Sequence, residues 1–171
     1  MIKIETTRLI LREFEVKDAD DVFSFASNKE VSIYTGEEAI TEKSQALDII
    51  EKTWFVDYAK YGYGRWAVIH KPDNKLIGFA GLKYLSDIDE VDIGYRFLPE
   101  YWGNGIATEA SIEIMKYGFE VLNIERIIGI AMPENVASCK VLEKIGLKFY
   151  KTDNYADEDN LFNWYKKEMS L

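Results

Sequence analysis

Residues 102–109, with the sequence WGNGIATE, constrain the fold because the hydrophobic period of the chain changes there. Residues 91–97 before them alternate apolar with other side chains, as a strand does, and Pro99 ends that pattern. After them, apolar residues recur at helical spacing from residue 107 to residue 122. A loop with two glycines therefore joins a predicted strand to a predicted amphipathic helix.

The two glycines of this loop, Gly103 and Gly105, favour the binding of a phosphate group. Glycine lacks a Cβ atom, so backbone N–H groups can approach a ligand closely, and the first turn of a helix adds N–H donors without helical partners. A tight turn that binds nothing explains the same glycines equally well. Taken alone, the loop leaves both interpretations open.

Two common phosphate-binding motifs do not fit the loop. The Walker motif requires a Gly-Lys-Ser/Thr ending, which is absent here. The dinucleotide fingerprint requires a third glycine where this chain has Thr108, and it requires an acid at the end of the second strand. Glu125 has about the right spacing but opens the next predicted strand. A nicotinamide-dependent dehydrogenase is therefore disfavoured.

The loop resembles motif A of the GCN5-related N-acetyltransferases (GNAT), whose pattern is Gln/Arg-x-x-Gly-x-Gly/Ala. Here the motif spans Trp102 to Ala107, with Trp102 in the Gln/Arg position. That departure, together with Gly94-Tyr95 and the run from Pro99 to Ala110, resembles the branch of the RimJ/RimL ribosomal-protein acetyltransferases. The resemblance extends over almost the whole chain and is strongest from Asp92 to Leu147. It implies an α/β (α+β) fold with a mixed, mostly antiparallel sheet, splayed at the cofactor site and flanked by helices.

The composition fits one domain, residues 1–171, with a sizeable core, since 47% of the residues are hydrophobic. One cysteine excludes an internal disulfide, and one cysteine with one histidine excludes a Cys/His zinc site, so no metal is expected. The chain has no run of roughly 18 apolar residues, as a membrane span needs, and its start lacks the apolar stretch of a signal peptide. We expect a cytoplasmic monomer or homodimer without a membrane partner.

The formal net charge of −9 disfavours nonspecific binding of nucleic acid, which depends on lysines and arginines that displace counterions. The charge suits a cationic substrate, although acidity chiefly favours solubility. Residues 34–40 form a predicted loop with Glu37 and Glu38, followed by an aromatic helix. The aromatic side chains of this helix are expected mainly to fill the core. The loop and the helix are also candidates to receive the amine acceptor, because loops often carry specificity and the first two helices of the resembling family flank the acceptor cleft.

The remaining periodicity predicts further elements. Strands are expected at residues 8–14, 65–70, 76–82, 91–97, 126–131, 149–155 and 161–169. Helices are expected at residues 18–26, 41–58, 107–122 and 135–146, with a loop at residues 28–40. Thr41 and Asn135 are the expected N-caps, and the turn at residues 72–74 makes a hairpin with His70 at the surface.

Acetyl transfer from a thioester to an amine first requires a proton acceptor. Asp92 is the first candidate, because related sequences commonly place a Glu two residues before the Gly-Tyr pair. A water relay would compensate for the shorter side chain, and Glu90 on the same strand face is the reserve. The structural alternative for Asp92 is a solvent-facing carboxylate on a strand.

The thioester oxygen requires donors, and the departing thiolate requires a proton or a hydrogen bond. In the family, a bulge before the loop exposes a backbone N–H, which here would lie near Gly94. Many members use a Tyr for the thiolate, at a position that is Leu142 here, whereas the RimJ/RimL branch offers a Ser, here Ser138. The alternative role of Ser138 is support of the helix start. Cys139 lacks an evident activating partner, which disfavours an acyl-enzyme.

The resemblance also implies the residues that bind the coenzyme. Asn135 matches the residue that hydrogen-bonds the pantetheine amides, with a simple helix cap as its alternative. Lys140 either meets the adenosine end or, as we favour, only solvates the helix. The implied cofactor-binding residues are Ile93, Gly94, Tyr95, Trp102, Gly103, Asn104, Gly105, Ile106, Ala107, Thr108, Asn135 and Lys140.

Together these features predict an acetyl-CoA-dependent N-acetyltransferase that uses direct attack by an amine in a ternary complex. The acceptor is left open between a protein N-terminus, a polyamine and another small amine such as an aminoglycoside. The alternative from a different class is a noncatalytic acyl-CoA-binding module on the same fold.

Overall fold

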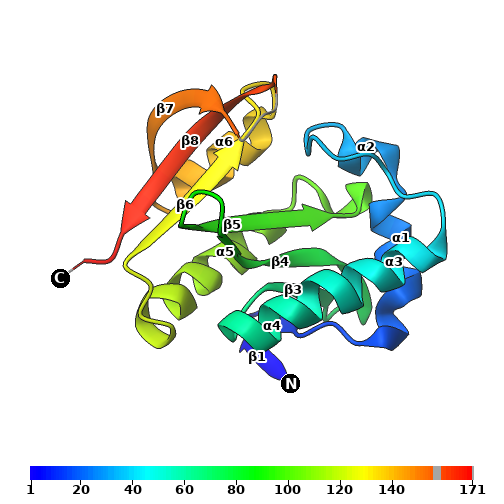
Figure 1. Ribbon diagram of the computed structural model, residues 1–171. Coiled ribbons are helices and arrows are strands. Elements are labelled where there is room, and N and C mark those ends of the chain that lie inside the picture. Colours follow the sequence, from blue (N-terminus) through cyan, green and yellow to red (C-terminus); the bar gives the residue numbers. More distant parts are fainter. Residues whose placement is uncertain (156–158, 171) are drawn as a thin grey trace.

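The computed structural model describes residues 1–155 and 159–170, which contain an eight-stranded sheet of order β1-β2-β3-β4-β5-β6-β8-β7 (Figure 1). The strands are β1 (Ile2–Glu5), β2 (Leu9–Arg12), β3 (Arg65–His70), β4 (Lys75–Leu85), β5 (Glu90–Phe97), β6 (Arg126–Ala131), β7 (Lys148–Asn154) and β8 (Leu161–Glu168). Every neighbouring pair is antiparallel except β5 and β6. The predicted mixed, mostly antiparallel sheet is confirmed, with β1 as an unpredicted edge strand. An acidic turn is also expected between the last two predicted strands, at residues 157–160, and of these residues 157 and 158 lie outside the described residues.

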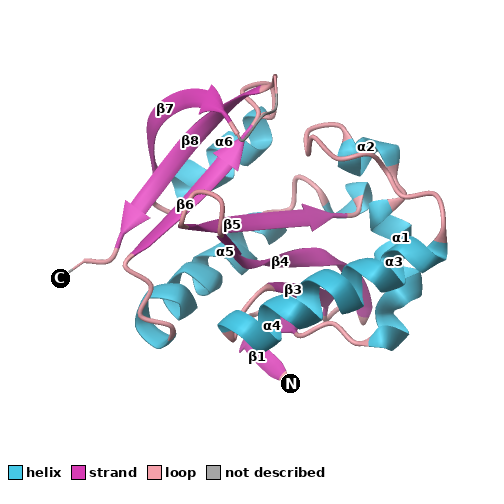
Figure 2. Cartoon of the chain, in the orientation of Figure 1, coloured by secondary structure: helices cyan, strands magenta, loops and turns pink. Residues whose placement is uncertain are grey.

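Helices cover both faces of this sheet (Figure 2). They are α1 (Ala19–Ala26), α2 (Lys29–Ser32), α3 (Lys43–Ile49), α4 (Phe55–Tyr61), α5 (Ile106–Lys116) and α6 (Val136–Lys144). A π-helical segment, Ile50–Trp54, joins α3 to α4, and another, Tyr117–Val121, extends α5. The predicted helices are therefore present, with single-turn irregularities inside two of them.

Two predictions for residues 28–42 were wrong in detail. The expected loop contains the short helix α2, whose N-cap Asn28 accepts a hydrogen bond from the Glu30 amide at 2.9 Å. The N-cap of α3 is Glu42, which forms a reciprocal capping box with Gln45. Thr41 instead donates its backbone N–H to the Gln45 side chain at 2.8 Å, one residue outside the helix.

Apolar side chains bind the helices to the sheet on each face. Against α5 and α6, the core includes Trp66, Leu82 and Ile114, each fully buried. The core on the face covered by α1 and α3 includes Phe14 and Trp54, whose rings stack with centroids 4.0 Å apart. Burying each such side chain contributes about 1.5–3 kcal/mol. Trp54 therefore fills the core, as predicted for most aromatic residues of this helix.

A buried ion pair attaches α1 to β2. The Asp18 carboxylate accepts two hydrogen bonds from the Arg12 guanidinium, both at 2.8 Å, and one from the Glu15 amide at 2.8 Å. The Asp18 side chain is only 4% exposed. Because all these donors converge on one carboxylate, the start of α1 is held at a fixed place on the sheet.

His70 is not the surface residue that we predicted. Its side chain is 17% exposed, its Nδ1 lies 3.0 Å from the Asp73 carboxylate, and its ring meets the edge of Tyr101. The Tyr101 hydroxyl also donates to Asp73, at 2.5 Å. The turn therefore closes over His70 through contacts that local sequence does not reveal.

The parallel strands β5 and β6 diverge, as Figure 1 shows. They pair at one position, Asp92 with Ile128, whereas β4 and β5 pair continuously from Gly78–Phe97 to Leu85–Glu90. The expected splay of the sheet is therefore present. The expected bulge at Gly94 is not, because the β4–β5 register has no shift. Among the described residues, no helix is long and apolar enough to cross a membrane.

Candidate active site

A cavity of about 300 Å³ enters the gap between β5 and β6 and receives side chains from both faces of the sheet. Arg65, Lys83 and Asp92 line it from the side of α3 and α4, together with Arg96. Residues from the side of α6, including Ser138, line it beyond the gap. The divergence of two parallel strands thus connects the two faces of the sheet through one cleft.

Asp92, the predicted proton acceptor, lies inside this cleft and is 13% exposed, so the solvent-facing alternative does not hold. Its Oδ2 accepts a hydrogen bond from Arg65 Nη2 at 2.7 Å. Burial raises the pKa of the Asp92 carboxyl above its ordinary value, and the charge and hydrogen bond of Arg65 oppose that rise, as does Lys83. Asp92 is therefore more basic than an exposed aspartate.

Arg65 is a site residue that the sequence patterns do not predict. Its guanidinium also donates to the carbonyl oxygens of Gly81 at 2.6 Å and Asp92 at 3.1 Å. A Cβ atom added at Gly94 would lie 2.5 Å from Arg65 Nη2, so Gly94 provides the space for this side chain. The strand register places Arg65, Gly81 and Gly94 side by side across three strands. No local pattern marks Arg65 in the sequence, because the two glycines beside it lie on other strands.

Ser138 meets Tyr95 inside the cleft. The two hydroxyl oxygens lie 2.9 Å apart, and the Tyr95 hydroxyl also lies 3.2 Å from the Ser138 carbonyl oxygen, to which it can donate. Burial chiefly raises the pKa of Tyr95, so its phenol stays protonated at neutral pH. Asn135 caps α6 by accepting from the Ser138 amide at 3.2 Å. The Ser138 side chain thus bonds Tyr95, while Asn135 performs the capping.

The two loop glycines adopt the left-handed backbone conformation, with φ of 73° at Gly103 and 74° at Gly105. A Cβ at Gly103 would have no heavy atom within 4 Å, so the surface there is open. In the described part of the chain, no acceptor is bonded to the backbone amides from Gly103 to Thr108. These donors, at the start of α5, fit the diphosphate of a coenzyme.

Arg8 fixes the loop from the other end of the chain. Its Nη1 donates to the Asn104 carbonyl oxygen at 2.9 Å, and its Nε donates to Glu109 at 2.6 Å. Thr6 adds a 2.6 Å hydrogen bond to the same carboxylate. On the other side, the half-exposed Trp102 donates its indole N–H to the Phe97 carbonyl oxygen at 2.8 Å. The loop is thereby held at both ends.

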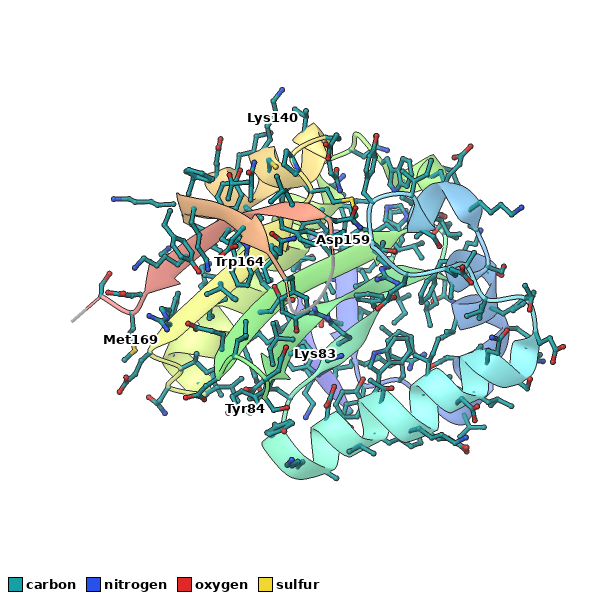
Figure 3. All side chains as sticks on the ribbon, turned by 45° about the horizontal axis from the view of Figure 1, so that its top comes forward. Lys83, Tyr84, Lys140, Asp159, Trp164 and Met169 are labelled. Carbon is teal, nitrogen blue, oxygen red and sulfur yellow. The ribbon has the colours of Figure 1, made fainter. Side chains whose placement is uncertain are left out.

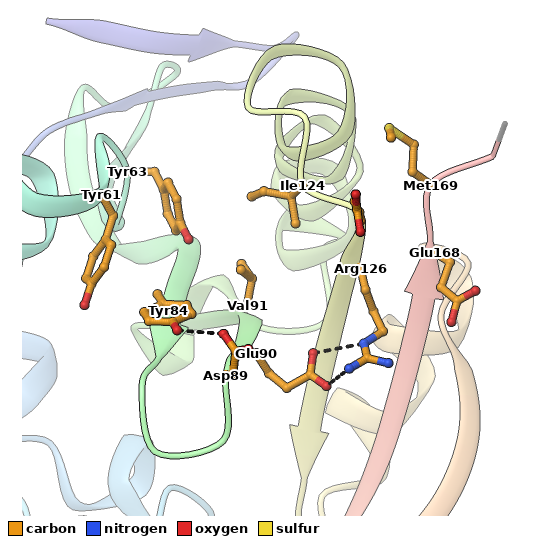
Figure 4. A pocket seen from close by; sticks show the side chains of 11 residues that line it. Tyr61, Tyr63, Tyr84, Asp89, Glu90, Val91, Ile124, Arg126, Glu168 and Met169 are labelled. Atoms are coloured by element: carbon orange, nitrogen blue, oxygen red, sulfur yellow. Dashed lines mark hydrogen bonds and ion pairs between the residues drawn. The ribbon is translucent and has the colours of Figure 1, made fainter.

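No residue of the loop 102–108 lines the cleft, and three further candidates also lie outside it. Lys140 is exposed on α6 and points away from the sheet (Figure 3). Cys139 is half-buried with its Sγ 3.8 Å from the Met132 carbonyl oxygen. Glu90 lines a separate cavity of about 930 Å³ and is ion-paired with Arg126 (Figure 4). The reserve base is therefore in a different cavity from Asp92.

Part of the predicted acceptor loop reaches the cleft. Tyr34 and Thr35 line it, and the Glu37 carboxylate pairs with Arg96 at 2.8 Å. Glu38 does not line it. Tyr61 at the end of α4 and Tyr63 just after it line a separate cavity instead. Within the described residues, no group of three or more His, Cys, Asp or Glu side chains is placed to hold a metal ion.

Residues 8–148 match the acetyltransferase (GNAT) domain. The chain belongs to the GNAT acetyltransferase family. It is 35% identical over 146 residues to the uncharacterized N-acetyltransferase YoaA of Bacillus subtilis, covering 85% of this chain and 82% of YoaA. A GNAT-family acetyltransferase structure from Bacillus anthracis shares 30% identity with a TM-score of 0.81, covering 98% of this chain and 97% of that one.

Another GNAT structure resembles the chain in fold alone. The ribosomal-protein acetyltransferase RimL, solved in complex with coenzyme A, has a TM-score of 0.85 at 16% identity and covers 99% of this chain and 98% of RimL. The identity is too low to carry a substrate across. The family membership supports N-acetyltransferase chemistry in general, and the acceptor has to be argued from the cleft.

Proposed function

We propose that this GNAT protein transfers an acetyl group from acetyl-CoA to a primary amine by direct attack in a ternary complex. The observation that carries the proposal is the cleft between β5 and β6, which brings Asp92 and Ser138 to one cavity from opposite faces of the sheet. Direct transfer needs both reactants in one cavity, because the nitrogen must contact the thioester carbon. An acyl-enzyme on Cys139 is not needed, and this side chain does not line the cleft.

The residues that would hold the coenzyme lie on the α5 and α6 side of the gap. The unpaired amides from Gly103 to Thr108 would bind the diphosphate, and the Asn135 side-chain NH₂ would bind a pantetheine amide. Acetyl-CoA would supply the acetyl thioester. Ile93, Gly94 and Tyr95 line the cleft where the sheet opens, so the acyl end would lie against them. Lys140, exposed and outside the cleft, would at most meet the adenosine end.

Asp92 would accept the proton that the ammonium must lose. Its raised pKa makes it a stronger base than an exposed aspartate, and Arg65 fixes the carboxylate in the cleft. On the other side of the gap, Tyr95 and Ser138 form a pair of hydroxyls that would donate toward the departing sulfur. One proton is thus removed at one face of the sheet and a hydrogen bond is supplied at the other.

The test combines binding and turnover. Calorimetry with acetyl-CoA and a thiol-release assay with peptide N-termini, spermidine and small amines should show binding and acetylation by the wild type. Asp92→Asn should retain coenzyme affinity and lose about 100-fold or more in kcat. Asp48→Asn, which changes an exposed aspartate of α3 outside the cleft, is the matched control. Coenzyme binding without acetylation of any amine would favour the noncatalytic module, and unchanged turnover would remove Asp92 as base.

A further inference from the structure

On the acceptor side of the cleft, cationic side chains outnumber carboxylates. Three cationic side chains line it, Arg65, Lys83 and Arg96, against the two carboxylates Asp92 and Glu37. Each guanidinium is paired with one carboxylate, at 2.7 Å for Arg65 and Asp92 and at 2.8 Å for Arg96 and Glu37. In the part of the chain that the structure describes, Lys83 has no ion pair. Among the described residues, three cations thus face two carboxylates in the cleft lining, although the net charge of the protein is −9.

Lys83 is held beside the predicted base by the sheet itself. It is the direct cross-strand partner of Asp92 in the β4–β5 ladder, so the two side chains project from neighbouring positions on one face. Figure 3 shows Lys83 between the α3–α4 helix and the β7–β8 hairpin. The Asp92 Oδ2 accepts its hydrogen bond from Arg65. Among the described residues, the Lys83 ammonium has no hydrogen-bond acceptor, so its donors are available to a ligand.

The nearby Asp57 does not remove this excess charge from the cleft. It lies on α4 outside the cavity lining, and its Oδ2 is buried without a hydrogen-bond partner among the described residues. Burial raises the pKa of Asp57, against the opposing charges of Lys83 and Arg65. A carboxyl that is harder to ionise compensates Lys83 less than an exposed aspartate would.

We infer that the acceptor is a small amine that carries an anionic group close to its amino group. This inference rests on the proposed function, since it places the amine at Asp92 and the anion at Lys83. Directly opposed cross-strand residues have Cβ atoms about 4.5–5.5 Å apart, which matches an amine and an anion separated by a few bonds. The volume of about 300 Å³, at the low end for ligand pockets, favours a small acceptor over a long chain.

The same charges disfavour a polyamine. A second ammonium group on the acceptor would face Lys83 and the two arginines, and like charges in a partly buried cleft repel. The acidity of the whole chain therefore does not describe the site. Local charge, rather than net charge, selects the acceptor.

The test compares each acceptor with an analogue that lacks the anionic group. Glycine and β-alanine are assayed against their carboxamides, and phosphoethanolamine against ethanolamine, which separates carboxylate from phosphate as the preferred anion. We expect kcat/KM to favour at least one anionic member by about tenfold or more, the size of one charged hydrogen bond. Equal rates within all three pairs, or a higher kcat/KM for spermidine or a decapeptide, would overturn the inference.

Variants at position 83 test whether Lys83 causes the preference for anionic acceptors. Lys83→Met should reduce the preference to about twofold or less without changing the KM for acetyl-CoA, and Lys83→Arg should restore it. Lys60→Met, which removes an exposed lysine of α4 outside the cleft, should keep the wild-type preference. A preference that survives Lys83→Met would assign anion binding elsewhere and contradict the inference.

A binding measurement separates this inference from the proposed function. N-acetylglycine, N-acetyl-β-alanine and N-acetylphosphoethanolamine are titrated into the protein saturated with coenzyme A. Binding of any one that weakens about fivefold or more in Lys83→Met supports the anion site even if no amine is turned over. In that case only the proposed reaction fails. Acetylation of amines that lack an anionic group, without Lys83-dependent binding of these products, would support the proposed reaction and contradict the anion site.

Discussion

Arg65 Nη2 and Asp92 Oδ2 lie 2.7 Å apart in the cleft, with 12% and 13% of their side chains exposed. The contact joins β3 to β5 across β4, over the two glycines Gly81 and Gly94. This contact both helps and limits Asp92 as the proposed base. Arg65 fixes the carboxylate in place, and its charge limits how far burial raises the Asp92 pKa.

Replacing Arg65 should move the pH dependence of catalysis upward. Arg65 favours the charged carboxylate, so Arg65→Met removes an influence that lowers the Asp92 pKa while burial, which raises it, remains. Activity requires the ionised base, so the rate rises as pH increases through this pKa. The acid limb of kcat/KM should therefore lie at higher pH in the variant than in the wild type. A pH profile of thiol release checks this, and an acid limb that stays in place or moves downward contradicts it.

The hydroxyl pair of Tyr95 and Ser138 should act as a unit. Ser138→Ala and Tyr95→Phe should each lower kcat about tenfold, and the double variant should lose less than the product of the two. Each change should cost about 1 kcal/mol of unfolding free energy, the typical net value of one hydrogen bond. Steady-state kinetics with urea unfolding tests both effects. Independent, multiplicative losses would show that the two hydroxyls do not cooperate.

Alanine substitutions at two glycines with similar φ distinguish the effect of backbone strain on stability from an effect on coenzyme binding. Gly103 and Gly62 have φ of 73° and 77°, and a Cβ at either would have no heavy atom within 4 Å. Gly103→Ala and Gly62→Ala should therefore lose a similar stability, about 1–2 kcal/mol. Only Gly103→Ala should weaken acetyl-CoA binding, because its Cβ projects into the proposed diphosphate site. Calorimetry and thermal unfolding check this, and equal coenzyme affinities would remove the loop from the binding site.

The ion pair between Arg12 and Asp18 should stabilise the fold rather than the site. Removing one partner with Arg12→Met leaves a carboxylate that is 4% exposed without its charged donor, which costs about 3–5 kcal/mol. Lys17→Met, which removes an exposed ammonium paired with Glu15, should leave the free energy of unfolding close to the wild-type value. Urea unfolding of both variants measures the difference. A loss below 1 kcal/mol for Arg12→Met would show that this attachment of α1 is dispensable.

The sequence predicted elements with a strong local period and missed contacts between distant segments. The strand before the loop, α5, β6 and α6 follow from apolar spacing and caps, so they lie within a few residues of their predicted bounds. Arg65, Lys83 and Arg8 were missed because each acts through residues on other strands or loops. The bulge expected at Gly94 was wrong for the same reason, since the glycine accommodates a side chain from β3.

The site residues also divide into those that local sequence predicts and those that depend on contacts between distant segments. Asp92 and Ser138 were predicted from their positions within one strand and one helix, and the structure brings both to one cleft. Glu90 shares a strand face with Asp92, but Arg126 pairs with it in another cavity. The ion pairs that separate these two acids involve residues 27 and 36 positions away in sequence. No local pattern carries that information.

If the loop binds the coenzyme as proposed, its attachment to Arg8 links coenzyme affinity to the outermost strands. Arg8 precedes β2 and lies 96 residues from Asn104 and 101 from Glu109, so the loop is held only after the chain's beginning has joined the sheet. Edge strands open more readily than central ones. Fraying of β1 and β2 would release the loop while the middle of the sheet stays intact. Coenzyme binding would then be lost before the protein unfolds.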